Sequence, residues 1–106
     1  MAKYILVYKN NEASDWSALP KEEVKKIVTA WGEWVGSMGN ARQDGLPFKF
    51  GGKSVGHDGT KEADNLLTGF AVIEAQDFDE ALHIAQSAPN VVDGSGTIEV
   101  YEAFGF

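Results

Sequence analysis

The stretch GFAVIEAQDFDEALHIA, Gly69 to Ala85, contains a strand pattern that runs directly into a helix pattern. Both alternating faces of its first seven residues are mainly apolar, which is typical of a central strand in a covered sheet. Asp77, followed three residues later by Glu80, forms a variant of the capping box in which Asp replaces Ser or Thr. The apolar residues that follow at helical spacing are Phe78, Ala81, Leu82, Ala85 and Ala88. We therefore predict a central strand over 69–75 and a helix that begins after Asp77 and is closed by Pro89.

The same two periods predict the other elements. KYILVYK, residues 3–9, is apolar on both faces and indicates a second central strand. Helical spacing relates Val24, Ile27, Val28, Trp31, Trp34, Val35 and Met38, which predicts a helix over 20–38 that ends at Gly39. GTIEVYEAF, from Gly96, alternates apolar with polar residues and indicates an edge strand. A weaker strand is expected within 46–56.

The resulting order is strand, helix, strand, strand, helix, strand. This order predicts an α+β fold of the ferredoxin-like βαββαβ type, with a four-stranded antiparallel sheet and both helices on one face. The second apolar face of the central strands then needs a cover. In one domain over residues 1–106, the simplest cover is the same face of another copy, so we predict a homodimer.

Composition excludes several classes of function. The chain has no cysteine, which removes disulfides, thiolate nucleophiles and cysteine-based metal sites. Its net charge of −7 disfavours nucleic acid and anionic membranes as partners. The apolar run in MAKYILVYKNNE is too short for a signal sequence or a membrane span. We expect a cytoplasmic protein.

The glycine-rich stretch LPFKFGGKSVGHDG, Leu46 to Gly59, invites chemical interpretations. A phosphate loop would need a glycine where Pro47 stands and a helix directly after Ser54. A hydrolase triad is disfavoured because the adjacent His57 and Asp58 point to opposite sides of an extended chain. A metal site needs three convergent ligands, and His83, the other histidine, is expected in solvent on the second helix. We expect no metal and no cofactor.

The simplest interpretation of this stretch is a strand, Phe48 to Val55, that enters a turn at Asp58-Gly59. The alternative is that Ser54, His57 and Asp58 line a cleft. His57 is the group in this stretch that titrates near neutral pH, which makes it a candidate catalytic residue.

Two further pairs are candidate site residues. Trp31 and Trp34 lie one helical turn apart and form either part of the core or the wall of a ligand pocket. Glu99 and Tyr101 share the face of the last strand opposite Ile98 and Val100, so they are expected to point into the space between two subunits. A partly buried Glu99 there, with Tyr101, is a candidate for proton transfer.

The assembled pattern resembles the YCII-related family, which includes proteins with a DGPF motif. The matching segments are KYILVY, AWGEWVGSMGNA, DGLPF, GKSV with the following DG, LTGFAVIEAQDFDEALHIA and PNVVDGSGTIEVYE. The resemblance covers nearly the whole chain and implies a dimeric α+β barrel built from ferredoxin-like protomers.

Relatives in that family have been proposed to act through a histidine on the first helix and an aspartate just before the proline that ends the second. This chain has no histidine in Pro20 to Met38, and Ala88 precedes Pro89. That chemistry therefore does not carry over. Two functions stay open: a dimer that presents a small-molecule-binding cleft without catalysis, and a cofactor-independent lyase or isomerase that acts on a small hydrophobic, oxygenated substrate.

Overall fold

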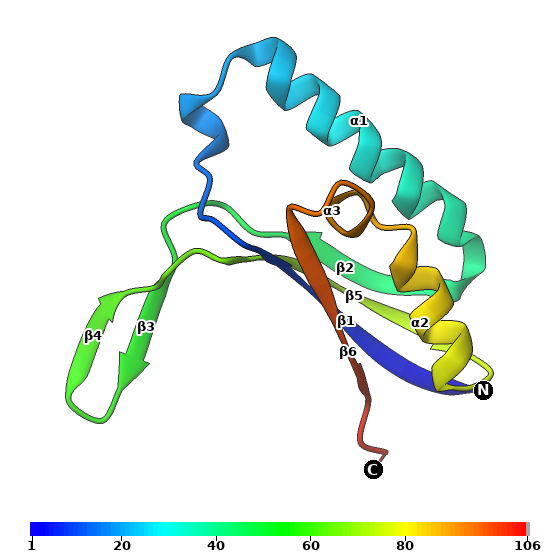
Figure 1. Cartoon of the computed structure of the whole chain (residues 1–106). Helices are drawn as coiled ribbons and strands as arrows, with labels where there is room; N and C mark the ends of the chain where they lie inside the picture. The colour runs from blue at the N-terminus through cyan, green and yellow to red at the C-terminus, as the bar shows by residue number, and fades with distance from the viewer. Residues whose placement is uncertain (106) are drawn as a thin grey trace.

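Four strands form one antiparallel sheet in the order β2-β5-β1-β6, and the helices cover one of its faces (Figure 1). The computed structural model describes residues 1–105. The strands of the sheet are β1 (Ala2–Asn10), β2 (Arg42–Pro47), β5 (Leu67–Ala75) and β6 (Gly96–Glu102). The helices are η1 (Trp16–Ala18), α1 (Lys21–Met38), η2 (Gly39–Ala41), α2 (Phe78–Gln86) and α3 (Pro89–Val92). The order of these elements confirms the ferredoxin-like α+β fold, with β1 and β5 at the centre.

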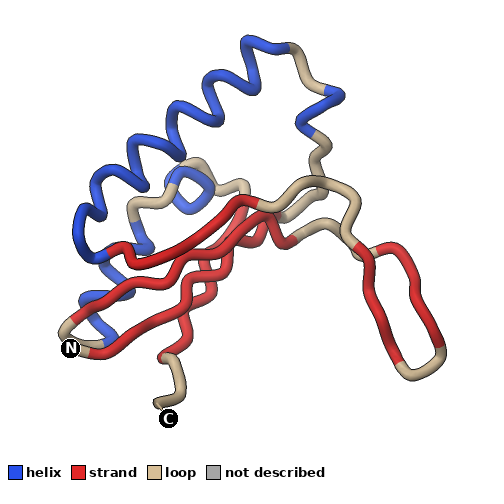
Figure 2. The backbone as a smooth tube through the Cα atoms, turned by 180° about the vertical axis from the view of Figure 1, so that it is seen from behind, coloured by secondary structure: helices blue, strands red, loops and turns tan. Residues whose placement is uncertain are grey.

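A separate two-stranded hairpin is inserted between β2 and β5. It consists of β3 (Lys53–Gly56) and β4 (Gly59–Glu62). The backbone trace shows it bending away from the helix layer (Figure 2). The predicted strand Phe48 to Val55 is therefore wrong: the edge strand ends at Pro47, and the chain pairs again only from Lys53, outside the main sheet.

The edge strand β2 is not recognisable from its sequence, RQDGLP, because apolar and polar residues do not alternate in it. Gly45 is nonetheless required there. A Cβ on Gly45 would lie 2.6 Å from the carbonyl oxygen of Phe70 on β5. The turn predicted at Asp58-Gly59 lies one residue earlier, at His57 and Asp58, where it connects β3 to β4.

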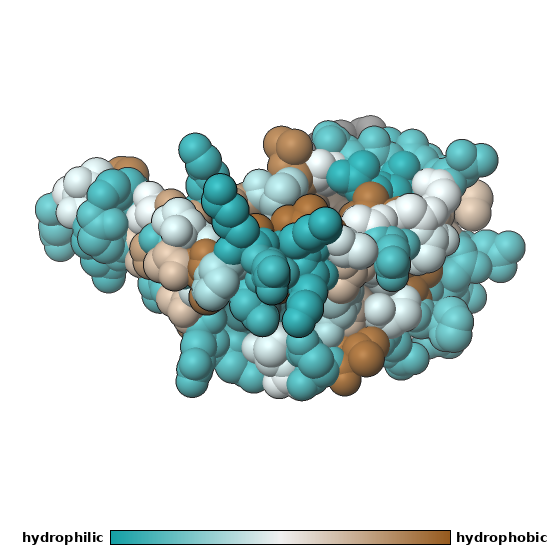
Figure 3. Space-filling view, turned by 90° about the horizontal axis from the view of Figure 1, so that it is seen from above, coloured by the Kyte–Doolittle hydropathy of each residue, from teal (hydrophilic) through white to brown (hydrophobic). Residues whose placement is uncertain are grey.

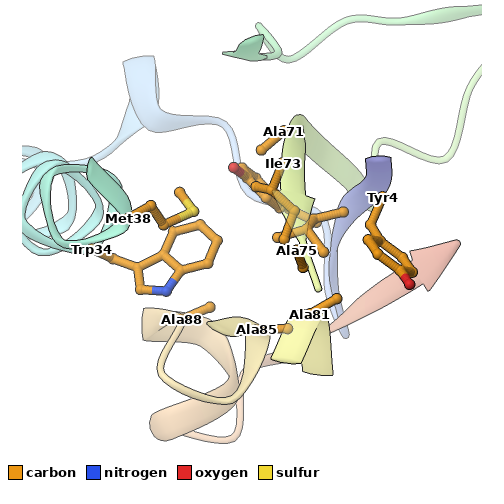
Figure 4. Packing of buried hydrophobic residues seen from close by; sticks show 11 residues of the cluster. Tyr4, Trp34, Met38, Ala71, Ile73, Ala75, Ala81, Ala85 and Ala88 are labelled. Carbon is orange, nitrogen blue, oxygen red and sulfur yellow. The ribbon is translucent and has the colours of Figure 1, made fainter. Parts of the chain in front are cut away.

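The core lies between the sheet and the helices (Figure 4). Trp34 and Met38 of α1 point toward Ile73 of β5, and small side chains of α2 complete the layer. Ala81, Ala85 and Ala88 are buried, as predicted, whereas Phe78 and Leu82 are 40% and 41% exposed. The small residues let α2 lie close to the sheet.

The helix α1 ends where the sequence indicates and begins one residue later than predicted. Pro20 precedes its first residue, and Gly39 follows its last residue with a positive φ of 54°. Its apolar stripe is less completely buried than predicted, because Val28 is 52% exposed. Among the described residues, no helix is long and apolar enough to cross a membrane.

The other face of the sheet, which we call the open face, is not covered by any described helix (Figures 1 and 2). Strand register aligns Val7 with Phe70, and Phe70 with Leu46, across three strands. The apolar or aromatic side chains of this face are Ile5, Val7, Leu46, Phe48, Phe70, Val72 and Tyr101. By contrast, the surface on the helix side is largely hydrophilic (Figure 3).

Candidate functional site

A cleft of about 640 Å³ opens between α1, α3 and the segment that follows β1. Its volume lies within the usual range for small-molecule pockets. It is lined by Asn10, Asn11, Glu12, Ala13, Ser14 and Trp16 on one side, by Lys26, Ile27, Ala30 and Trp31 from α1, and by Pro89, Asn90, Asp93 and Ser95. The cleft thus combines aromatic and aliphatic walls with the side-chain amides of Asn10, Asn11 and Asn90.

Trp31 forms the aromatic wall that α1 contributes. Its ring stacks on Tyr8 of β1, with centroids 4.9 Å apart and planes at 28°. Trp34 lies edge-on to Trp31 at 5.6 Å. This packing fixes Trp31 from the core side while its other side borders the cleft, and stacked aromatic contacts of this kind favour one ring orientation.

Trp34, the second indole of the predicted pair, belongs to the core. It is 4% exposed. Its Nε1 donates to the carbonyl oxygen of Ile84 and to Oγ of Ser87, both at 3.2 Å, and so joins α1 to α2. Of the two tryptophans proposed as pocket walls, the structure brings only Trp31 to the cleft.

Trp16 closes the cleft from the opposite side. It begins η1, where Oδ1 of Asp15 accepts from the backbone nitrogen of Ser17 at 3.0 Å and from its Oγ at 2.6 Å. Such a cap satisfies amide groups that the short helix leaves free. Trp16 also lines a second cleft of about 520 Å³ with Phe48, Phe50 and Leu67, so it separates two hollows of the surface.

Asn90 is the most buried polar residue of the cleft wall, with 3% exposure. Its Nδ2 donates to the carbonyl oxygens of Lys9 and Thr97 at 3.2 and 3.3 Å, and to Oδ1 of Asn10 at 3.3 Å. These three acceptors settle the orientation of the amide. Its Oδ1 accepts no hydrogen bond from the described residues.

Charged groups at the cleft are few. Asp93 accepts from the backbone nitrogen of Ser95 at 2.8 Å, and hydrogen bonding from Ser95 holds the pKa of this carboxyl below its ordinary value. It is therefore ionised at neutral pH. Lys26 lies on the rim and forms an ion pair with Glu23 at 3.9 Å. Among the described residues, no three imidazole or carboxylate groups lie close enough together to hold a metal ion.

The candidates from the glycine-rich stretch lie elsewhere. His57 and Asp58 form the exposed turn of the hairpin, and Ser54 lies half-buried on β3. None of them lines either of the two clefts described above. Their role in lining a cleft therefore has no counterpart in these two clefts and stays a prediction.

Glu99 and Tyr101 lie together on the open face. Register pairs them with Val7 and Ile5 of β1. The Tyr101 hydroxyl donates to Oε1 of Glu99 at 2.7 Å, and this hydrogen bond raises the pKa of Tyr101. The pair could relay a proton only to a molecule held against the open face, because the cleft lies on the helix side.

The amides of the cleft were missed by sequence reasoning. Asn10, Asn11 and Asn90 carry no motif, and two of the three acceptors of Asn90 lie about 80 residues away in the chain. The sequence does contain one signal, because Asn90 is a polar residue between Pro89 and the apolar Val91 and Val92. The sequence does not show which groups its amide binds.

The sequence matches the model of the YCII-related domain over residues 2–106. The chain belongs to the YCII-related family. A search of curated proteins gives no match. Among solved structures, this YCII-related protein is similar to 5-chloro-2-hydroxyhydroquinone dehydrochlorinase (TftG) from Burkholderia phenoliruptrix, in complex with 2,5-dihydroxybenzoquinone. The TM-score is 0.61 at 16% identity, and the alignment covers 98% of this chain and 95% of that chain. An identity this low shows the shared fold alone.

In this YCII-related chain, the residue before Pro89 is buried in the core and does not line the cleft. Ala88 is fully buried against the core, and Pro89 lines the cleft. On the facing wall, α1 presents Ile27, Ala30 and Trp31. The histidine and aspartate attributed to relatives are thus absent from a cleft that here has apolar and aromatic walls.

Proposed function

We propose that the protein is a homodimer that binds a small planar molecule in the cleft beside α1. The observation that carries this proposal is the pairing of an aromatic wall, Trp31, with the side-chain amides of Asn10 and Asn11 in a hollow of about 640 Å³. The buried amide of Asn90 holds this part of the wall in place. Aromatic walls with a few fixed polar groups are the usual composition of such sites. A planar ring would stack on the indole, and its polar substituents would meet the amides.

A binding assay tests this directly. We expect that a panel of aromatic and hydroxy acids contains ligands that quench tryptophan fluorescence and raise the melting temperature. Ala30 lines the cleft on α1, whereas the exposed Thr29 beside it does not. Ala30→Arg should abolish the shift by filling the cleft, and Thr29→Arg should keep it. Equal responses in both variants would place the ligand elsewhere.

The open face supports the homodimer. It carries seven apolar or aromatic side chains, and Leu46 and Tyr101 are 63% and 55% exposed in the single chain. Apolar patches of this kind mark interaction sites, and a self-complementary patch forms a two-fold interface. Light scattering at micromolar concentration should give a dimer. Val7→Lys on the open face should give a monomer, while Val28→Lys on the outer side of α1 should stay dimeric.

A cofactor-independent lyase or isomerase is the second candidate. It is favoured by the Glu99–Tyr101 hydrogen bond on the open face and by the fold shared with a dehydrochlorinase. In a dimer, this pair would face the partner's sheet, where burial alters the proton affinity of a carboxylate.

Chloride release distinguishes the two functions. The protein would be incubated with a chlorinated hydroxyhydroquinone, with Glu99→Gln and Tyr101→Phe as variants. Release that is lost in both variants would support the enzyme. Release that persists unchanged in both would remove this pair from the reaction, and the absence of release would leave the binding function as the better description.

A further inference from the structure

Within residues 1–105, the hairpin of β3 and β4, residues 53–62, pairs with no other strand. Its cross-strand pairs run from Lys53 with Glu62 to Gly56 with Gly59. A lone two-stranded hairpin is marginally stable in water, so a hairpin held in one position needs a surface to pack on. Val55, at its middle, is 78% exposed in the single chain.

The base of the hairpin is nevertheless well fixed. Oδ1 of Asn65 accepts from the backbone nitrogens of Gly51 and Gly52, both at 2.9 Å. Ala63 donates from its backbone nitrogen to the carbonyl oxygen of Gly52 at 3.0 Å. Asn65 itself has a positive φ of 59°, a conformation that asparagine adopts more readily than most non-glycine residues. These contacts set the direction in which the hairpin leaves the sheet.

That direction is away from the helices, on the side of the open face (Figures 1 and 2). Each strand of the hairpin has four residues, which at about 3.3 Å per residue gives a length of roughly 13 Å. Two sheets packed face to face lie about 10 Å apart. The hairpin is therefore longer than the distance between two packed sheets. If a second copy packed its sheet on the open face, the hairpin would reach past the plane of that sheet.

We propose that the hairpin is an arm that packs on the second copy of this chain through the face that carries Val55. This inference rests on the proposed homodimer. The same face of the hairpin carries Thr60 and the ion pair between Lys53 and Glu62, and the opposite face carries Ser54 and Lys61. Each subunit would thus hold its partner both by the sheet and by the arm.

A single introduced cysteine tests the arm, because the chain has none of its own. His57→Cys at the tip and Val92→Cys on α3, a residue that is 74% exposed, would each carry a photoactivated cross-linker. We expect a covalent dimer from His57→Cys and none from Val92→Cys. A dimer by light scattering without a cross-link from His57→Cys would overturn the arm and leave the homodimer standing. A monomer would overturn both.

Affinity gives a second measurement. Val55→Ser should raise the dimer dissociation constant about tenfold, the effect expected from losing one buried aliphatic side chain. Lys61→Ser, on the other face of the hairpin, should leave it unchanged. If the two variants shift the dissociation constant equally, or neither shifts it, the assigned face is wrong.

Discussion

A methyl group placed on Gly96 would lie 2.2 Å from the carbonyl oxygen of Lys9, far inside any real contact distance. Gly96 opens β6 opposite Asn10, and the same methyl group would lie 2.8 Å from Nδ2 of Asn90. Gly96→Ala must therefore push the ends of two strands apart. We expect it to lower the free energy of unfolding by about 2 kcal/mol, measured by urea denaturation.

The matched control is Gly36→Ala. Gly36 lies in α1, where an added Cβ meets nothing within 4 Å. Alanine is the better helix former by about 1 kcal/mol, so this variant should be slightly more stable than the parent protein. A loss in Gly36→Ala as large as that in Gly96→Ala would show that close approach at β6 is not the cause.

Asn90 should contribute strongly to stability. Asn90→Ala removes the donor that three oxygens share at the ends of β1 and β6, and we expect a loss of about 3 kcal/mol in urea denaturation. Asn90→Asp should cost more at neutral pH, because it places a carboxylate against oxygen atoms. That environment raises the pKa of the introduced carboxyl. The stability of this variant should therefore recover in part as the pH falls, and a pH-independent loss would contradict the interpretation.

The fold was predictable in the segments where apolar residues recur with a single clear strand or helix spacing. The strands over 3–9 and 69–75 are apolar on both faces, and α1 has a long apolar stripe between Pro20 and Gly39. The edge strand β2 was misplaced because edge strands need little apolar surface. Gly45 and Pro47 interrupt its pattern, while the aromatic FKF that follows imitates a strand but lies in a loop.

The candidate site was predictable only in part, for a different reason. Trp31 was identified because helical spacing places it on the stripe. Two acceptors of Asn90, Lys9 and Asn10, lie on β1 about 80 residues away, and no local pattern encodes a contact across that separation. His57 carried the most suggestive chemistry in the sequence, yet it forms the exposed tip of a hairpin.

Tyr8 should make stability depend on pH in the alkaline range. It is buried beneath Trp31, and burial raises the pKa of Tyr8 to about 12, with Arg42 opposing the shift. Between pH 10 and about 12 the unfolded chain loses this proton while the folded chain keeps it, so the stabilisation present below pH 10 is lost as pH rises. We expect a decrease of roughly 2 to 3 kcal/mol in the free energy of unfolding. Tyr8→Phe should reduce the dependence of the free energy of unfolding on pH in this range. If that dependence were unchanged, groups other than Tyr8 would cause it.

Glu99→Gln should change how Tyr101 titrates. In the parent protein, the hydrogen bond to the Glu99 carboxylate stabilises the protonated phenol and raises the pKa of Tyr101, with the negative charge of Glu99 adding to the effect. A neutral amide removes the charge, so tyrosinate absorbance should appear at lower pH than in the parent protein. Glu62→Gln, on the hairpin strand β4, is the control and should leave that titration in place, because among the described residues only Glu99 acts on Tyr101 as a charged neighbour. If the pKa of Tyr101 were unchanged in Glu99→Gln, the hydrogen bond between Tyr101 and Glu99 would not form in solution.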